Sequence, residues 1–293
     1  MTAAGVTVIV PTVGRSDMLG DALVAIAACA PPPAELLVID QSENGTAQRV
    51  LDERGVAGRV IAMRQAGIAA ALNVAMQAAT HDRVMVTHDD CLVAPDWIEV
   101  ASELLDEAPD ALWTGRVLPD VPDGEDPSRV PSTIDHPEPV DYTGRVETGV
   151  LYPANMAVRR EGVLSLGGFD ERFTLAAEDN DFCLRWMLAG RSVRYTPRLT
   201  VWHRDWRSPE DLQRIYRQYQ LAHGAFLAKY LRLHHPLAPG LVIGTVRWAL
   251  RGTARRVLRR TGVDETTASL THIPLGFLRG WRPMRPVRDR WIS

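Results

Sequence analysis

The first ninety residues alternate between short apolar runs and segments of helical composition. The four runs are VTVIVP (6–11), LLVID (36–40), RVIAM (59–63) and RVMVT (83–87). Between them lie SDMLGDALVAIAACA, where Ser16 is the expected helix cap, and the alanine-rich GIAAALNVAMQAA. Uninterrupted apolar strands separated by helices indicate a parallel sheet covered on both faces. The pattern therefore predicts a doubly wound α/β fold for this half.

The pattern changes after Pro95, which should begin a helix that leads into a strand-like ALWTGRV. Residues 118–147 are rich in proline and acids, and we expect a mobile loop that acts as a lid or binding segment. We then expect a helix EDNDFCLRWMLAG and two strands, SVRYTP and LTVWH. A long helix should follow, with Ser208 as its cap and Pro209 at its first position. After Pro236 the chain reads as helical, basic and amphipathic.

Polar residues follow three of the four apolar runs at the point where each strand should end. They are PTVGR after the first run, Asp40 with QSENG after the second, and His88-Asp89-Asp90 after the fourth. In open parallel sheets, ligands bind at the carboxyl ends of the strands. We therefore expect the chemistry along this edge.

Composition and cysteine usage narrow the class of protein. The 293 residues are 46% hydrophobic with a net charge of -3, enough for a sizeable globular core. The three cysteines are far apart and show no zinc or CxxC spacing, the start lacks a secretory signal, and no apolar run reaches the roughly 20 residues of a membrane span. These features predict a cytoplasmic protein that does not cross a membrane and whose cysteines are buried apolar residues.

The C-terminal part is strongly basic. Residues 247–290 contain eleven arginines against Asp264, Glu265 and Asp289. Two interpretations stand side by side: amphipathic helices that pack on the body, or peripheral attachment to an anionic membrane surface, at its inner face. No recognition motif supports nucleic-acid binding.

Four motifs occur in an order that resembles a known family. They are VTVIVPTVGR; LLVIDQS; VTHDDC followed by PDW; and GGFDERF followed by AAEDNDFCLRW and TVWH. Together they resemble the family-two inverting glycosyltransferases, nucleotide-sugar-dependent enzymes with the GT-A fold. The resemblance covers residues 6 to about 206 and implies a nucleotide-sugar-binding half (1–110) and an acceptor-binding and catalytic half (111–206). The charge and helical pattern of residues 207–293 predict a C-terminal basic amphipathic helical extension.

Adjacent carboxylates at the end of an apolar strand need a compensating charge. A divalent cation such as Mn²⁺ or Mg²⁺ supplies it, because hard cations are held by carboxylates and bridge to phosphates. By resemblance Asp90 binds the metal and Asp89 faces the ribose or the metal, while His88 stands where relatives have another aspartate. The alternative is a turn that caps the next segment.

The donor nucleotide should contact the same edge. Asp40 resembles the residue that recognises the base, and its alternative is a solvated turn aspartate; Thr12 and Arg15 could reach the nucleoside or diphosphate. The resemblance adds donor contacts at Pro11, Gly67 and Asn73. No strand is followed by GxGxxG, which argues against a dinucleotide oxidoreductase.

A general base must accept the proton of the acceptor hydroxyl. Resemblance assigns this role to Asp179, with Glu178 orienting it or touching the acceptor, and we expect Asp181 to be structural. The alternative for this acidic turn is charge complementarity with the helix dipole.

The remaining candidates concern the metal and the acceptor. His203 falls where relatives place a histidine near the metal, although a lone histidine after a strand is more often simply hydrogen-bonded. We expect acceptor contacts from Asn155, Gly168, Trp202 and Trp206, with Tyr152 as a further candidate. The glycines at 167 and 168 equally fit a turn with positive φ. Trp97, Trp113 and Trp186 are expected in the core.

The sequence thus predicts a metal-dependent inverting transferase, of the hexosyl or deoxyhexosyl class, that moves one sugar to an acceptor hydroxyl. Its acceptor would be lipid-linked or close to a membrane. Processive relatives carry QxxRW and membrane spans that this sequence lacks. Two rivals remain: a nucleotidyltransferase, although PTVGR lacks the expected lysine, and a sugar-nucleotide or glycan-binding protein without turnover.

Overall fold

The structure is a computed structural model that describes residues 5–64, 67–145, 147–174, 176–204, 206–259 and 265–281. Of these, the side chains of residues 255–268 and of 270 and 271 are not described. The chain divides into two compact units: Met1–Thr174 with Glu178–Asp205, and Leu175–Ala177 with Trp206–Ser293. Part of the predicted basic tail, residues 282–290, lies outside the described residues.

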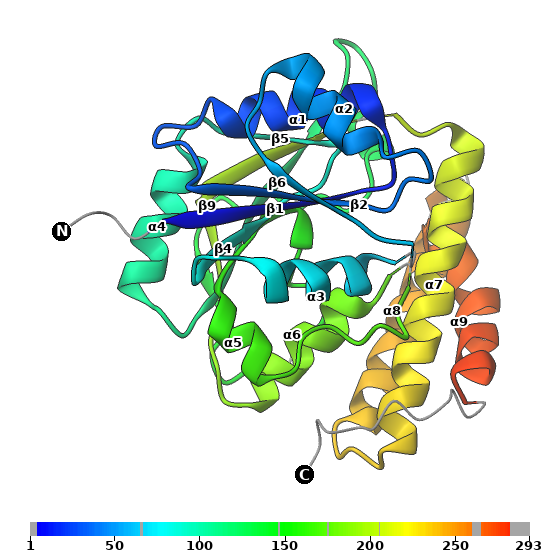
Figure 1. The fold of residues 1–293 in the computed structure, drawn as a ribbon. Coiled ribbons are helices and arrows are strands. Elements are labelled where there is room, and N and C mark those ends of the chain that lie inside the picture. Colours follow the sequence, from blue (N-terminus) through cyan, green and yellow to red (C-terminus); the bar gives the residue numbers. More distant parts are fainter. Residues whose placement is uncertain are drawn as a thin grey trace. The chain divides into compact units, whose positions relative to one another are not determined.

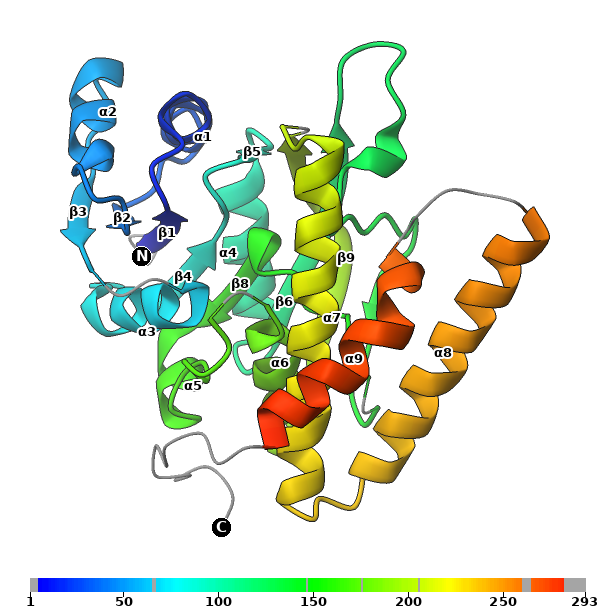
Figure 2. The same ribbon diagram turned by 90° about the vertical axis from the view of Figure 1, so that its right-hand side faces the viewer.

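The first unit begins with the expected alternation of strands and helices (Figure 1). Its elements are β1 (Val6–Thr12), α1 (Ser16–Ala27), β2 (Glu35–Asp40), α2 (Thr46–Arg54), β3 (Arg59–Ala62), α3 (Ile68–Ala78) and β4 (Arg83–Val86). These four strands are parallel and lie in the order β3-β2-β1-β4. Helices α1 and α2 cover one face of the strands and α3 the other (Figures 1 and 2). The doubly wound prediction for this half is confirmed.

The second half of the unit completes a mixed sheet. It contains β5 (Cys91–Val93), α4 (Trp97–Glu107), β6 (Leu112–Asp120), the 3-10 turn η1 (Pro127–Arg129), β7 (Val140–Asp141), η2 (Pro153–Asn155), β8 (Met156–Arg159), α5 (Arg160–Ser165), α6 (Glu178–Leu188) and β9 (Val193–Arg204). The sheet order continues from β4 as β8-β6-β9-β5, with β7 beside β9. β8 is antiparallel to β4 and β6, and β5 is antiparallel to β9.

The core of this unit lies on both faces of the sheet. Strands β1, β2 and β4 are buried at almost every position, which explains their uninterrupted apolar sequence. Trp97, Trp113 and Trp186 are buried, as predicted. The three cysteines are also buried and unpaired, again as predicted.

Two strands predicted separately, SVRYTP and LTVWH, form the single strand β9. Its pairing with β6 shifts register: Gly115 lies opposite Thr196, but Arg116 lies opposite Thr200. Pro197 has no N–H for the ladder, so the strand bulges here and then resumes. The sequence pattern predicted the interruption of the strand at Pro197 but not that both parts belong to one strand.

The segment predicted as a mobile loop, residues 118–147, packs on the sheet. Ile134 pairs with Val117, and both Val130 and Ile134 are buried. The Tyr195 hydroxyl donates to the carbonyl of His136 at 2.9 Å. Apolar residues scattered among the prolines hold this segment against the sheet. The many turn-forming residues nevertheless led to the prediction of a mobile loop.

Helix starts were predicted with mixed success. Ser208 caps α7 (Pro209–Arg232) as expected, since its hydroxyl accepts the N–H of Asp211 at 3.1 Å and Pro209 is the first helical residue. The prediction for Ser16 was wrong: Arg15 precedes the helix and no side chain caps it.

The second unit consists of α7, α8 (Ala238–Arg259) and α9 (Glu265–Trp281). Helix α9 lies along α7, and α8 stands to one side (Figure 2). Glycines allow the close approach, because a Cβ at Gly276 would lie 2.0 Å from the carbonyl oxygen of Leu221, and one at Gly224 would lie 2.1 Å from that of Ile273. Among the described residues, no helix is long and apolar enough to cross a membrane.

Candidate active site

Three strand ends bring the predicted polar residues to one edge of the sheet. Thr12 ends β1 directly opposite Asp40, which ends β2. β4 runs parallel to β1 on its other side and leads into Asp89 and Asp90. The parallel arrangement therefore places all these residues at the carboxyl edge, as the sequence predicted.

Asp89 is held by the loop that follows β1. The Thr12 hydroxyl donates to Asp89 Oδ2 at 2.6 Å, and Arg15 forms an ion pair with Asp89 Oδ1. Burial and the neighbouring charge of Asp90 raise the pKa of Asp89, while Arg15 and Thr12 oppose that shift. The Arg15 side chain is partly exposed and also lies 3.5 Å from Asp90 Oδ2. A cationic group thus already faces both carboxylates.

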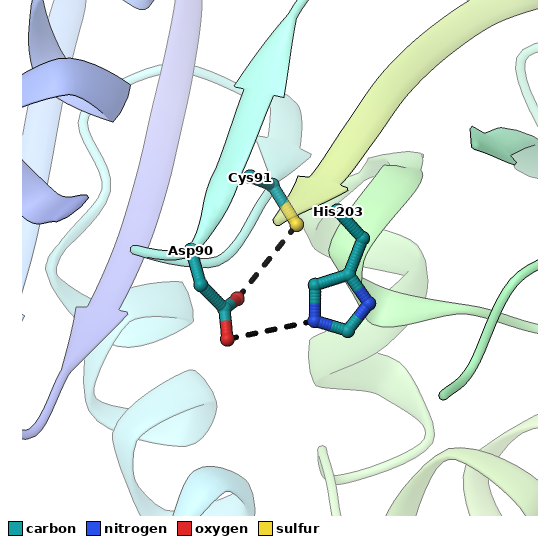
Figure 3. Close-up of side chains that lie close together, drawn as sticks. All are labelled: Asp90, Cys91 and His203. Atoms are coloured by element: carbon teal, nitrogen blue, oxygen red, sulfur yellow. Dashed lines mark hydrogen bonds and ion pairs between the residues drawn. The ribbon is translucent and has the colours of Figure 1, made fainter. Parts of the chain in front are cut away.

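Asp90, Cys91 and His203 form a buried cluster (Figure 3). Cys91 and His203 are register partners in the antiparallel pair of β5 and β9, so their side chains share one face of the sheet. Asp90 Oδ2 lies 3.5 Å from His203 Nε2, and the Cys91 thiol lies 3.8 Å from Asp90 Oδ1. The potential ligand atoms of the three residues are all within 4.8 Å of one another.

The electrostatics of this cluster favour an ionised Asp90. Burial alone would raise the pKa of Asp90, but His203, Arg15 and His88 outweigh it and hold that pKa well below its ordinary value. Burial, reinforced by Asp90, raises the pKa of the Cys91 thiol well above its usual range. Asp90 is therefore a carboxylate, and Cys91 is a neutral thiol beside it.

The orientation of His203 is set by a backbone carbonyl. His203 Nδ1 lies 2.9 Å from the oxygen of Pro131, which can only accept, so Nδ1 carries the proton. A ring that is also protonated at Nε2 donates that proton to Asp90, which is the state that lowers the pKa of Asp90; a neutral ring offers the Nε2 lone pair to a cation bound beside Asp90. A carboxylate oxygen and an imidazole nitrogen suit Mn²⁺ or Mg²⁺, and the Nδ1–carbonyl bond is the outer contact typical of ligating histidines. The donor set therefore fits a divalent cation.

A second pair of acids begins α6. Glu178 is buried, and in the described part of the chain its Oε2 has no hydrogen-bond partner. Burial and the charge of Asp179 raise the pKa of Glu178 well above its ordinary value. Burial also raises the pKa of Asp179 to about 6, although Asn180 donates its N–H to Asp179 Oδ1 at 2.7 Å. One carboxylate of this pair is thus readily protonated and the other titrates near neutrality.

The loop that leads to α6 lies against the carboxyl edge of the parallel strands. The Gly67 N–H donates to Gln41 Oε1 at 2.8 Å, which joins the residue before α3 to the residue after β2. A Cβ at Gly67 would lie 3.2 Å from the carbonyl oxygen of Thr174, four residues before Glu178. These contacts place Gly67 between the loop after β2 and Thr174.

Asn73 anchors the same loop farther back. Its amide nitrogen donates to the carbonyl of Phe169 at 2.9 Å and its amide oxygen accepts the N–H of Phe169 at 2.7 Å. Gly167 and Gly168 both have positive φ, and a Cβ at Gly168 would lie 2.3 Å from Asn73 Oδ1. Gly168 thus permits this contact, and its carbonyl accepts a bond from Arg185, which pairs with the buried Asp181. Asp181 is structural, as expected.

Two further candidates have their polar atoms engaged within the fold. Asp40 is 1% exposed, so it is not the solvated turn residue of the alternative interpretation; it accepts the N–H groups of Ser42 and Ala47. Asn155 is fully buried, accepts from Trp97 Nε1 and donates to the carbonyls of Arg116 and Leu199. Asn155 is therefore not accessible to an acceptor, and the prediction of a direct contact through its side chain is wrong.

The aromatic candidates are partly exposed. Tyr152, Trp202 and Trp206 are each half-buried, and the guanidinium of Arg207 lies 4.3 Å from the Trp206 ring. Sequence reasoning missed Cys91 and the Pro131 carbonyl as parts of the site. Their proximity follows from strand pairing and from the return of the 118–147 segment, neither of which is visible in local sequence.

Comparison with solved structures identifies the fold. TarS from S. aureus in complex with UDP is 19% identical, with a TM-score of 0.56 over 78% of this chain and 71% of that one. The mannosyltransferase PcManGT from Pyrobaculum calidifontis, in complex with GDP-Man and Mn²⁺, is 21% identical, with a TM-score of 0.58 over 92% and 79%. No curated protein matches the sequence. The fold is that of GT-A glycosyltransferases.

A family model narrows the class further. The model described as "Glycosyltransferase like family 2" matches residues 3–220, which include the whole sheet and both acidic pairs. The chain belongs to this family. It is therefore a glycosyltransferase that takes its sugar from a nucleotide sugar, as the motifs predicted.

Proposed function

We propose that the protein is a metal-dependent, inverting transferase that moves a single sugar from a nucleoside diphosphate to an acceptor hydroxyl. The observation that carries this proposal is the contrast between two acidic pairs. Asp90 is kept ionised beside a histidine and an arginine, whereas the pKa of Asp179 is raised to about 6. One environment suits cation binding and the other suits proton transfer.

Asp90 and His203 would hold the divalent cation. Bound there, Mn²⁺ or Mg²⁺ would neutralise the charge that develops on the diphosphate leaving group. Both residues belong to, or directly precede, paired strands, so their positions are set by the sheet. The complex of PcManGT with GDP-Man and Mn²⁺ supports this choice of cation.

Residues of the first two loops would bind the rest of the donor. Arg15 could leave its ion pair with Asp89 and bind the diphosphate instead. Asp89 would face the ribose whether or not that ion pair is broken. Pro11, Asp40 and Gly67 lie at the same carboxyl edge and are proposed as nucleoside contacts, through the main chain where their polar side-chain atoms are already engaged. For Asn73 we propose an indirect role, because its amide is bonded to Phe169.

Asp179 is the proposed general base. Its Oδ1 accepts the N–H of Asn180, and Oδ2 is the oxygen proposed to receive the proton of the acceptor. The acceptor oxygen would attack the anomeric carbon, its proton would pass to Asp179 Oδ2, and the bond to the diphosphate would break on the opposite face. One such displacement inverts the configuration.

Glu178 and Asn180 would position this base. A neutral Glu178 limits the repulsion within the acidic pair, because only one of the two groups is then charged. Asn180 also accepts the N–H of Gly149 at 2.6 Å, which joins α6 to the segment before β8. Glu178 remains a second candidate for contact with the acceptor.

The sugar is proposed to be a hexose or deoxyhexose. TarS has been solved with UDP-GlcNAc and PcManGT with GDP-Man, so both relatives bind hexosyl donors. For the acceptor we propose stacking on Trp202 or Trp206 and a backbone contact near Gly168, with Asn155 supporting the sheet behind. The division into a donor half (1–110) and an acceptor half (111–206) follows these assignments. An acceptor carried on or near a membrane would suit the basic helices of residues 207–293.

The test is release of nucleoside diphosphate from a panel of nucleotide sugars with Mn²⁺. For Asp179→Asn we expect turnover to fall by at least about 100-fold while the affinity for nucleotide is retained, because a general base contributes about 10²–10⁴ in rate. Asp110→Asn, an equally conservative change at an exposed position, should leave both quantities unchanged.

Three outcomes would contradict the proposal. Unchanged turnover in Asp179→Asn would remove Asp179 as the base. Release of pyrophosphate from nucleoside triphosphates would indicate a nucleotidyltransferase. Tight nucleotide-sugar binding without any turnover, across donors and acceptors, would indicate a binding protein.

A further inference from the structure

Helix α8 exposes an apolar stripe. Ile243, Val246 and Leu250 are 51%, 50% and 55% exposed, and their spacing of three and four places them on one face of the helix. The buried residues Ala238 and Ala249 lie on an adjacent face, about a quarter of a turn away from the stripe. Helix α8 therefore packs through one side and leaves a second apolar side without a partner among the described residues.

Arginines run beside this stripe. Arg247 and Arg251 are exposed and follow Ile243 and Val246 by four and five positions, so they flank the stripe along one edge. Between Asp211 and Asp264 the sequence contains no aspartate or glutamate but ten lysines and arginines. The described face is thus apolar and cationic at once, with no acidic group on α8 to neutralise it.

Helix α9 adds a similar exposed set. Leu275 and Leu278 are exposed beside Arg279, and Trp281 ends the helix with 49% of its surface exposed. Trp248 on α8 is 45% exposed, but it projects from the other side of the helix and is not part of the stripe. Tryptophan, leucine and arginine together are typical of segments that rest at the boundary between headgroups and acyl chains.

We propose that α8 lies in the surface of a membrane that contains anionic phospholipid, with Ile243, Val246 and Leu250 in the acyl boundary and Arg247 and Arg251 among the phosphates. The charge selects this occupant. A second copy paired symmetrically through this same face would bring arginines against arginines, whereas anionic headgroups attract them and the acyl chains accept the stripe. A nucleic acid would leave the apolar stripe in water. The inference stands on the helical unit and does not depend on the transfer reaction.

The geometry also indicates how the helix would bind. No described helix can span a bilayer, so α8 would lie parallel to the surface and contribute by its face. Attraction of this kind weakens with salt, because it acts within a Debye length of the headgroups. The apolar contribution persists at high salt, so both parts can be measured separately.

The experiment is flotation of the full chain with vesicles of phosphatidylglycerol and phosphatidylcholine, or of phosphatidylcholine alone. We expect binding to the mixed vesicles, at least about 10-fold weaker binding to the neutral ones, and partial loss at 0.5 M salt. The pairs Ile243→Ser with Leu250→Ser, and Arg247→Gln with Arg251→Gln, should each reduce binding by about 10-fold or more.

Matched controls separate this surface from general surface effects. Val24→Ser on α1 and Arg49→Gln on α2 change exposed residues of the same kinds and should leave vesicle binding unchanged. All these substitutions are at exposed positions, so unfolding temperatures and release of nucleoside diphosphate in solution should match the unsubstituted chain.

Several results would overturn the inference. It fails if the full chain does not float with anionic vesicles, if neutral vesicles bind it equally, or if both α8 variants bind as the unsubstituted chain does. It also fails if the chain is a dimer in solution that the Ile243→Ser, Leu250→Ser variant converts to a monomer, because a second copy would then cover the stripe.

Discussion

Two pairs of neighbouring acids in this chain meet different electrostatic conditions. Arg15 and His203 outweigh the effect of burial at Asp90 and lower its pKa, whereas the pKa of the neighbouring Asp89 stays raised despite its contacts with Arg15 and Thr12. Glu178 and Asp179 are surrounded by little beyond backbone N–H groups, and burial raises the pKa values of both. The surroundings of these carboxyl groups therefore suit one of them to binding a cation and another to accepting a proton.

The raised pKa of Asp179 predicts a pH profile for activity. A general base must be ionised, so kcat/KM should rise with pH, reach half its maximum near pH 6 and level off above pH 7. An acid limb near pH 4 would mean that the essential carboxylate has an ordinary pKa, which would contradict the assignment of Asp179.

The same shift predicts how stability depends on pH. Because the pKa of folded Asp179 lies above the ordinary value of 3.8, the folded state binds the proton more tightly than the unfolded state. This contribution is present below about pH 4 and is lost as pH rises through 6. Without metal or donor, Asp179→Asn should therefore be more stable than the unsubstituted chain at pH 8, by about 1–3 kcal/mol, with no difference near pH 4.

Urea unfolding at a series of pH values measures this difference. Asp110→Asn provides the comparison, since an exposed carboxyl should give a small difference that does not change with pH. If the free energies of unfolding of Asp179→Asn and the unsubstituted chain differ by the same amount at every pH from 4 to 8, burial does not raise the pKa of Asp179.

At the scale of elements, strand pairing builds the proposed metal site. β9 pairs with β5 in the register that sets His203 against Cys91, and on its other side it pairs with β6 through a bulge after Thr196. Asn155 holds this bulge by donating to the carbonyls of Arg116 and Leu199. Gly115 leaves room for the Asn155 amide, since a Cβ there would lie 2.5 Å from its nitrogen. An amide far from the cation thus supports its ligands.

Helix pairing in the second unit depends on glycine at α9. A Cβ at Gly276 would meet the Leu221 backbone at 2.0 Å, whereas a Cβ at Gly244 on α8 would meet nothing within 4 Å. Gly276→Ala should therefore destabilise the protein by about 1–3 kcal/mol through overpacking. Gly244→Ala should stabilise it by about 0.5–1 kcal/mol, because alanine favours the helix.

Chemical denaturation of the two variants tests this pair of opposite signs. The substitution is the same and both positions are helical, so intrinsic propensity cannot explain a difference. If Gly276→Ala proves as stable as Gly244→Ala, the close crossing of α7 and α9 does not exist in solution.

At the scale of the whole molecule, charge is divided along the chain. Residues 212–263 hold ten of the 33 lysines and arginines and none of the 36 acids, so the remaining residues are strongly acidic in balance. An acidic body would repel a nucleotide sugar unless local cations reverse the field. Arg15 and the proposed divalent cation would supply that reversal at the sheet edge.

Donor binding should therefore stabilise the chain only when metal is present. At a free donor concentration about 100-fold above Kd, binding adds about 2.7 kcal/mol, which corresponds to a rise in Tm of about 5–10 °C. We expect this rise with Mn²⁺ and the preferred nucleotide sugar, and its loss with a chelator or in Asp90→Asn.

Thermal unfolding across a donor panel measures this effect and ranks the nucleotides. Asp110→Asn should respond as the unsubstituted chain does. A rise in Tm of equal size with and without chelator would contradict a role for metal in donor binding, while leaving Asp179 as the candidate base.

The sequence by itself determined what depends on neighbours along the chain. Apolar runs separated by helices defined the parallel half, the residues after those runs marked the reactive edge, and Ser208 with Pro209 marked the start of α7. These features follow from side-chain periodicity and local hydrogen bonds, which act over a few residues. The ordered motifs were enough to predict the family.

Only the tertiary structure decided which distant groups meet. It joined Cys91 to His203 through strand register and brought the Pro131 carbonyl to His203 from a segment that composition alone made look mobile. It also bonded the amide of Asn73 to Phe169 and buried the amide of Asn155. Such contacts depend on register, bulges and the return of loops, where a shift of one residue changes every partner. That is why their electrostatics, and the chemistry proposed from them, could not be predicted from local sequence.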